Sequence, residues 1–274
     1  MSIRGRPPDR GLTRPDPDAP RLYRSLLLGC RTIGRILGLR LELQGADHLP
    51  RDEQGHPAGG WIAIGVPHRT WIDPFVLALL LPAEPRLVFL GDGRAIYRSR
   101  LRRLMFERIG GVVPIWPGSG PRAFEEHVAA ARTVLDAGAV FALFPEVGPA
   151  VPVERARPFG GGIGYFAVRT GAPIVPLVLG GTDELFLGRT IVLRVLPPVR
   201  AADMLESESA REAGGSRPAW VPPAAGSPAE RAAAHRVVAA LERLVAADVA
   251  ECHRVAEPAP GTARRLRGLT HLFH

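Results

Sequence analysis

Short apolar runs alternate with helical patterns between residues 22 and 200, and this alternation restricts the folds open to the chain. The runs predicted to be strands are residues 39–43, 61–66, 86–90, 112–116, 139–144, 174–179 and 191–196. A turn is predicted at Gly91-Asp92-Gly93, directly after the third run. The segments predicted to be helices are residues 22–37, 74–81, 99–109, 121–137 and 164–170. Because strands separated by helices form parallel sheets with both faces covered, the sequence predicts an α/β fold. We expect a layered, largely parallel central sheet flanked by helices.

The rest of the chain divides into segments of different composition. Residues 1–20 are polar, proline-rich and without periodicity, which predicts a disordered N-terminal segment. Residues 21–205 form the predicted folded domain. Beyond it we expect a Pro/Ala/Gly/Ser-rich linker over 206–228, a helix over 229–254 and a loose basic tail over 255–274.

The net charge of +8 is carried entirely by arginine, since the chain has no lysine. A strongly basic domain is typical of proteins that meet nucleic acids, anionic membrane surfaces or acidic substrates. Aromatic residues make up only 6% of the chain and no nucleic-acid recognition motif is present, which disfavours nucleic acid. No run reaches the roughly 18 apolar residues of a membrane-spanning helix, and arginines interrupt the first apolar stretch. We therefore expect no spanning helix and no signal peptide.

The amphipathic segment 22–37 has two interpretations. Apolar residues recur at helical spacing with arginines between them. The helix could pack on the core with its arginines in solvent. Alternatively, it could lie on a membrane, with its arginines on anionic head groups.

Metal-ligating residues show no grouping along the sequence. Cys30 and Cys252 lie far apart, and the pair Cys252–His253 has no matching second pair. The sequence predicts neither a metal site nor a bound cofactor.

Two polar side chains follow the apolar run 61–66. His68 lies just after this predicted strand, and Asp73 is predicted to cap the next helix, with Pro74 at its first position. On a tight turn the carboxylate could hold one imidazole nitrogen and leave the other free to act as a base. Such a base could deprotonate a hydroxyl that attacks a thioester. By spacing alone, a simple helix cap and an unrelated loop histidine are the more common arrangement. No G-x-S-x-G segment occurs, which disfavours an acyl-serine enzyme.

Four ordered segments resemble the glycerolipid acyltransferase family, which includes the lysophospholipid or 1-acylglycerol-3-phosphate acyltransferases. They are the H-x-x-x-x-D box from His68 to Asp73, Gly110–Trp116, Phe144-Pro145-Glu146 with Gly148, and Thr170–Leu177. The resemblance covers about residues 22–200. It implies that residues 21–205 are an acyltransferase domain with a glycerol-phosphate acyltransferase-like fold.

The resemblance also implies a reaction and a site. The acyl donor would be a thioester of coenzyme A or acyl carrier protein, and the acceptor a hydroxyl of a lysophospholipid. His68 would be the general base, oriented by Asp73. The acceptor would be bound by Glu146, Gly148, Arg122 and Arg157. The protein would act as a peripheral, monotopic protein on the cytoplasmic face of the membrane, attached through residues 22–37.

Two of the four segments depart from the family pattern. The second carries Pro114–Pro117 where the family has an arginine, and the third inserts Val147 and lacks the Thr-Arg pair. Arg155 or Arg157 could replace the missing arginine. Two alternatives therefore remain open: an acyltransferase for a non-phosphate glycolipid or aminolipid, and a non-catalytic membrane- or lipid-binding module.

Overall fold

The centre of the computed structural model is one sheet, which within the described residues has seven strands in the order β1-β7-β6-β2-β5-β3-β4. The structure describes residues 21–36, 38–94, 111–116, 120–184, 188–206 and 221–257. The strands are β1 (Arg40–Gln44), β2 (Ile62–Val66), β3 (Leu87–Asp92), β4 (Val112–Ile115), β5 (Val140–Leu143), β6 (Ile174–Gly180) and β7 (Thr190–Val195). Of the paired strands in this part of the chain, β6 and β7 run antiparallel and the others parallel. This confirms the predicted α/β fold with a largely parallel sheet.

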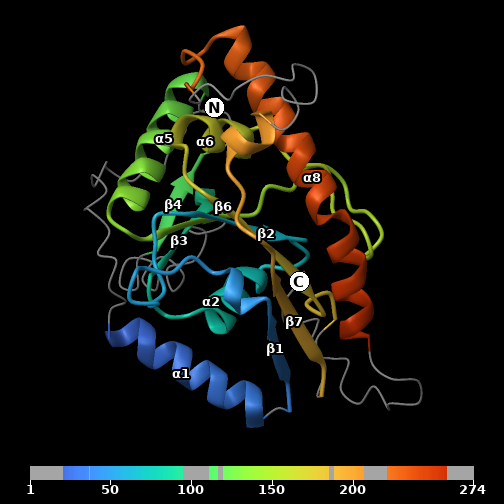
Figure 1. The fold of residues 1–274 in the computed structure, drawn as a ribbon. Coiled ribbons are helices and arrows are strands. Elements are labelled where there is room, and N and C mark those ends of the chain that lie inside the picture. The colour runs from blue at the N-terminus through green and yellow to red at the C-terminus, as the bar shows by residue number, and fades with distance from the viewer. Residues whose placement is uncertain are drawn as a thin grey trace, which may run out of the picture.

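Helices cover both faces of the sheet (Figure 1). The helical elements are α1 (Arg21–Ile36), η1 (Ala46–His48), α2 (Asp73–Leu80), α5 (Gly120–Asp136), α6 (Gly162–Thr170) and α8 (Pro228–Ala256). One apolar cluster joins the sheet to α1 and α2, and a second joins it to α5, α6 and α8. None of the helices in the described ranges combines the length and apolarity needed to cross a membrane.

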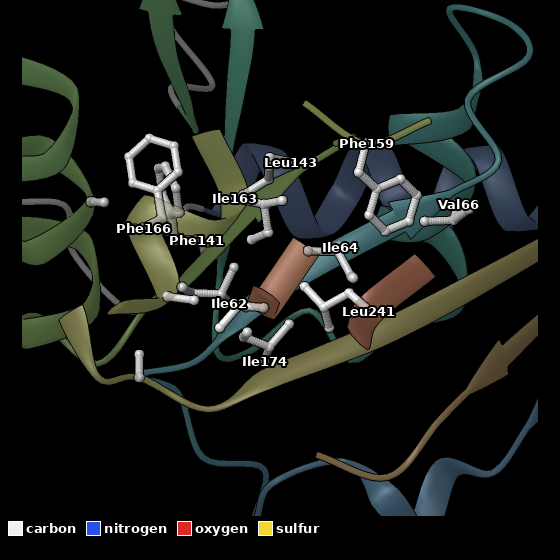
Figure 2. Packing of buried hydrophobic residues seen from close by; sticks show 14 of the residues in the cluster. Ile62, Ile64, Val66, Phe141, Leu143, Phe159, Ile163, Phe166, Ile174 and Leu241 are labelled. Atoms are coloured by element: carbon white, nitrogen blue, oxygen red, sulfur yellow. The ribbon is translucent and has the colours of Figure 1, made fainter. Parts of the chain in front are cut away.

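Side chains alternate between these two clusters along each central strand. In β2, Ile62 and Ile64 pack toward α6 and α8, whereas Ala63 faces the side of α2. Phe141 of β5 and Leu241 of α8 belong to the same cluster as Ile62 and Ile64 (Figure 2). Because both faces are covered by helices, every position in β2 and β5 is buried. This burial explains why these strands appear in the sequence as continuous apolar runs.

Helix α8 is part of the main core. Its buried side chains include Val237, Leu241, Val245 and Val249, and they pack against α6, β6 and β7. The Ser227 hydroxyl caps the helix by accepting a hydrogen bond from the Glu230 amide at 3.1 Å. The helix predicted over 229–254 therefore runs slightly further at both ends, from Pro228 to Ala256.

A buried ion pair attaches the start of α8 to α6, and its loss should destabilise the fold. Arg169 donates to both carboxylate oxygens of Glu230, at 2.6 and 3.0 Å. Arg169 also holds the pKa of Glu230 below its usual value, so stability present at neutral pH is lost as the pH falls through the acidic range.

We expect Glu230→Ala to lower the free energy of unfolding by about 3 kcal/mol, because it leaves the buried guanidinium of Arg169 without this partner. In the matched control Glu125→Ala, which removes the exposed partner of Arg169, the loss should stay below about 1 kcal/mol in urea unfolding. Equal losses in the two variants would contradict this account.

The turn predicted at Gly91–Gly93 is wrong. Strand β3 continues through Asp92, with Gly91 opposite Pro114 and Asp92 opposite Ile115 of β4. Pairing with β4 thus overrides the local preference of Gly91 for a turn. The next residue, Gly93, lies close to the ring of Trp116, since a Cβ atom on Gly93 would be 2.8 Å from that ring.

Some predictions fall outside the described residues. These are the N-terminal segment 1–20, the helix over 99–109, most of the linker over 206–228 and the tail from 258 onward.

Candidate active site

The carboxyl ends of β2 and β5 bring two loops together. These strands are parallel neighbours, with Ile64 opposite Leu143. The loop after β2 carries His68, and the loop after β5 carries Glu146. Since the carboxyl ends of parallel strands meet at one edge of the sheet, residues far apart in the sequence become neighbours there.

His68 and Asp73 are in contact. The Nδ1 atom of His68 lies 2.9 Å from Oδ2 of Asp73, and the Asp73 side chain is completely buried. The tight turn between strand and helix therefore brings the two side chains together, as the spacing allowed. The Asp73 carboxylate favours the tautomer with hydrogen on Nδ1, which leaves the lone pair on Nε2.

The imidazole ring lies on an aromatic support. It stacks on the ring of Phe144, with 4.3 Å between centroids and 26° between planes. Gly65 makes room for this arrangement, because a Cβ atom there would lie 2.5 Å from the Phe144 ring. The His68 side chain remains 37% exposed, and no described residue forms a hydrogen bond with its Nε2 atom. Nε2 is therefore the candidate base of the site.

Asp73 does not cap helix α2, so that prediction is wrong. The N-cap is Ile72, while Asp73 is the first helical residue and Pro74 follows it. The carboxylate instead turns back toward the loop. Its Oδ2 accepts from the amides of Arg69 and Thr70, both at 2.7 Å, and its Oδ1 accepts from the Thr70 hydroxyl at 3.2 Å. Asp73 therefore closes the turn that carries His68.

The residues predicted to bind the acceptor lie partly beside this dyad. Glu146 accepts from the His68 amide at 2.5 Å, and Arg157 donates to the His68 carbonyl at 2.7 Å. Gly148 adopts the left-handed conformation, with a φ of 86°. Arg122 belongs to helix α5, but its side chain lies outside the described part of the structure. The structure thus places Glu146 and Arg157 beside His68, and the Gly148 carbonyl lies 3.5 Å from Nη1 of Arg157.

Arg69 organises the loop after β5, a role that the sequence did not suggest. Its guanidinium donates to the carbonyls of Pro152 at 3.2 Å and Val153 at 3.3 Å. It also donates to the carbonyls of Val151 and Arg155. The residue after His68 thereby holds residues 151–155 against the histidine loop. Only its position inside the H-x-x-x-x-D box could have hinted at this role.

Apolar side chains lie at the surface near the dyad. Trp71 and Phe75 are both exposed and pack edge to face, with 5.6 Å between ring centroids. Val147, next to Glu146, is also exposed. Exposed apolar groups beside a polar dyad suit a substrate with an acyl chain.

Metal-ligating side chains do not gather elsewhere in the described ranges. No group of three or more His, Cys, Asp or Glu residues within these ranges is arranged to hold a metal ion.

A family model described as Acyltransferase matches residues 40–180, a range that contains the dyad, Glu146 and Arg157. The chain therefore belongs to the acyltransferase family, and the predicted family membership and enzyme class are confirmed. Among solved structures, the fold is similar to that of the 1-acyl-sn-glycerophosphate (LPA) acyltransferase PlsC from Thermotoga maritima. The TM-score is 0.54 at 18% sequence identity, and the match covers 86% of this chain and 83% of the other. A search of curated protein sequences finds no significant match.

Proposed function

We propose that this acyltransferase moves an acyl chain from a thioester of coenzyme A or acyl carrier protein to a hydroxyl of a lysophospholipid. The observation that carries the proposal is the contact of 2.9 Å between Nδ1 of His68 and Oδ2 of Asp73, on a His68 side chain that is 37% exposed. The 1-acyl-sn-glycerophosphate acyltransferase with a similar fold supports the choice of acceptor class.

The chemistry follows from the dyad. Nε2 of His68 takes the proton of the acceptor hydroxyl while the oxygen attacks the thioester carbonyl. Asp73 holds the ring and stabilises the imidazolium that forms. The tetrahedral intermediate then collapses, the C–S bond breaks, and the imidazolium returns its proton to the leaving thiolate. The products are an ester and a free thiol, and no covalent enzyme intermediate or bound cofactor takes part in this scheme.

The amphipathic helix α1 has an inner and an outer side. Leu27 is buried, and Arg31 donates to the carbonyls of Leu79 and Leu81 at the end of α2. Leu28 and Ile36 are 67% and 79% exposed. One side of α1 therefore packs on the core, while apolar groups remain outside. We propose that these outer groups enter the lipid interface on the cytoplasmic face of the membrane, where the enzyme is peripheral.

Membrane binding should weaken when the outer side of α1 becomes charged. We expect the double variant Leu28→Glu with Ile36→Glu to bind anionic vesicles at least about tenfold more weakly, because each inserted apolar side chain contributes about 1.5–3 kcal/mol. Vesicle co-sedimentation measures the loss. The control is Val221→Glu, which places the same charge on an exposed apolar residue before α8. Unchanged binding of the α1 variant would exclude this attachment.

A non-phosphate glycolipid or aminolipid is a second candidate acceptor. The Arg69 and Arg157 side chains both donate to backbone carbonyls. Trp116 and Pro117 stand in the segment where the family has an arginine. The roles of Gly148 and Arg122 in binding the acceptor, which the family resemblance implies, are part of this proposal.

The acceptor can be found by incubating the protein with mixed acyl-CoAs and a total lipid extract, followed by mass spectrometry of the lipids. An acylated phosphate-bearing lysolipid supports the main proposal, and an acylated glycolipid or aminolipid supports the second. Vesicle binding without any thioester consumption would instead support a non-catalytic lipid-binding module.

A further inference from the structure

The peptide group of His68 is held from both sides by residues of the loop after β5. On one side, Oε2 of Glu146 accepts from the His68 N–H at 2.5 Å. On the other side, Nη2 of Arg157 donates to the His68 carbonyl at 2.7 Å. The ring of His68 is set by Asp73 and Phe144, whereas its main chain is set by Glu146 and Arg157.

Glu146 and Arg157 also hold each other. Oε1 of Glu146 accepts from the Arg157 amide at 2.6 Å, and Nη2 of Arg157 lies 3.6 Å from Oε2 of Glu146. The Glu146 side chain is completely buried, and each of its oxygens accepts a hydrogen bond from the protein. A buried carboxylate that protein groups already satisfy is poorly placed to bind an acceptor.

The backbone around Glu146 is fixed as well. The Val147 amide donates to the Pro158 carbonyl, and the Gly160 amide donates to the Pro145 carbonyl, each at 2.8 Å. These bonds close the loop at its base, next to the His68 peptide. Glu146 and Arg157 therefore act on His68 from a rigid support rather than from a free loop.

We propose, on the basis of the proposed function, that Glu146 and Arg157 are positioning residues for the His68 base. By holding the N–H and the carbonyl of His68, they keep Nε2 at the place where the acceptor hydroxyl arrives. Displacement of a catalytic group by about 1 Å can cost about 100-fold in rate. This role differs from the acceptor binding that the family resemblance implied for the two residues.

The test compares Glu146→Gln and Arg157→Lys with matched controls at exposed positions. In the first variant the glutamine amide would place an NH₂ group against an N–H donor, and in the second the lysine cannot reproduce the guanidinium contacts. The controls Glu154→Gln and Arg51→Lys make the same chemical changes at exposed positions, and Arg51 also donates to a backbone carbonyl, that of Gly55. We would measure kcat and the acceptor KM at a temperature at which circular dichroism shows every variant to be folded.

We expect kcat to fall about 30- to 100-fold in both positioning variants, with the acceptor KM within about twofold of wild type. The two controls should keep the wild-type kcat. A raised KM with unchanged kcat would show that the two residues bind the acceptor, and wild-type kinetics in the folded variants would show a purely structural role. Either result overturns the inference. If Glu146→Gln does not fold, Arg157→Lys decides by the same criteria. A wild-type protein without acyl transfer would instead overturn the proposed function itself.

Discussion

Replacing His68 with alanine is expected to lower kcat for acyl transfer by about 10³-fold, because general-base catalysis contributes about 10²- to 10⁴-fold. The His68 side chain is 37% exposed, so its removal leaves no closed cavity and the variant should remain folded. Thiol release from an acyl-CoA in the presence of the acceptor measures the rate.

A second His–Asp pair provides the control for this change. Nδ1 of His56 lies 3.6 Å from Oδ2 of Asp52, in an exposed loop away from the sheet edge that carries the dyad. His56→Ala should leave kcat unchanged. If His68→Ala retains the wild-type rate, His68 is not the base and the mechanism is wrong.

Replacing Asp73 with asparagine should have a similar or larger effect on kcat, about 10³- to 10⁴-fold. The amide cannot favour hydrogen on Nδ1 of His68 as a carboxylate does. It must also face the amides of Arg69 and Thr70, which both donate to Oδ2. The free energy of unfolding should therefore fall by about 1–3 kcal/mol, because a neutral amide oxygen is a weaker acceptor for these two donors than a carboxylate.

Asp52→Asn is the matched control for this second change. Asp52 also accepts from backbone amides in a turn, those of Gln54 and His56, but in an exposed loop. The Asp52→Asn variant should keep the wild-type kcat. An Asp73→Asn protein that is folded and fully active would show that Asp73 only closes the turn. Thermal unfolding of both variants separates lost stability from lost catalysis.

The sequence predicts the sheet well because its central strands are buried on both faces. In β2, Ile62 and Ala63 point to opposite clusters, yet both are inaccessible to solvent. Such strands appear as uninterrupted apolar runs, and the helices between them keep a 3.6-residue period. Local patterns failed at Gly91, where pairing with β4 extends the strand through residues that would otherwise favour a turn.

The site is predictable only as far as its parts are local. His68 and Asp73 lie on one turn, so their spacing allowed the contact. The contacts of Glu146 and Arg157 with the His68 peptide depend on the adjacency of β2 and β5, which no single segment encodes. The helix cap predicted at Asp73 failed because the turn amides occupy the carboxylate. For Glu146 and Arg157 a tertiary contact decided which partner the side chain took, whereas for Asp73 the amides of its own turn did.

The proposed function is tested most directly by measuring free thiol and acylated lipid together when the purified protein acts on vesicles that contain an acyl-CoA and a lysophospholipid. The proposed mechanism predicts that wild-type protein forms both products at equal rates and that His68→Ala loses both together. Lipid acylation that continues at the wild-type rate in His68→Ala would contradict it, as would wild-type thiol release without any acylated lipid.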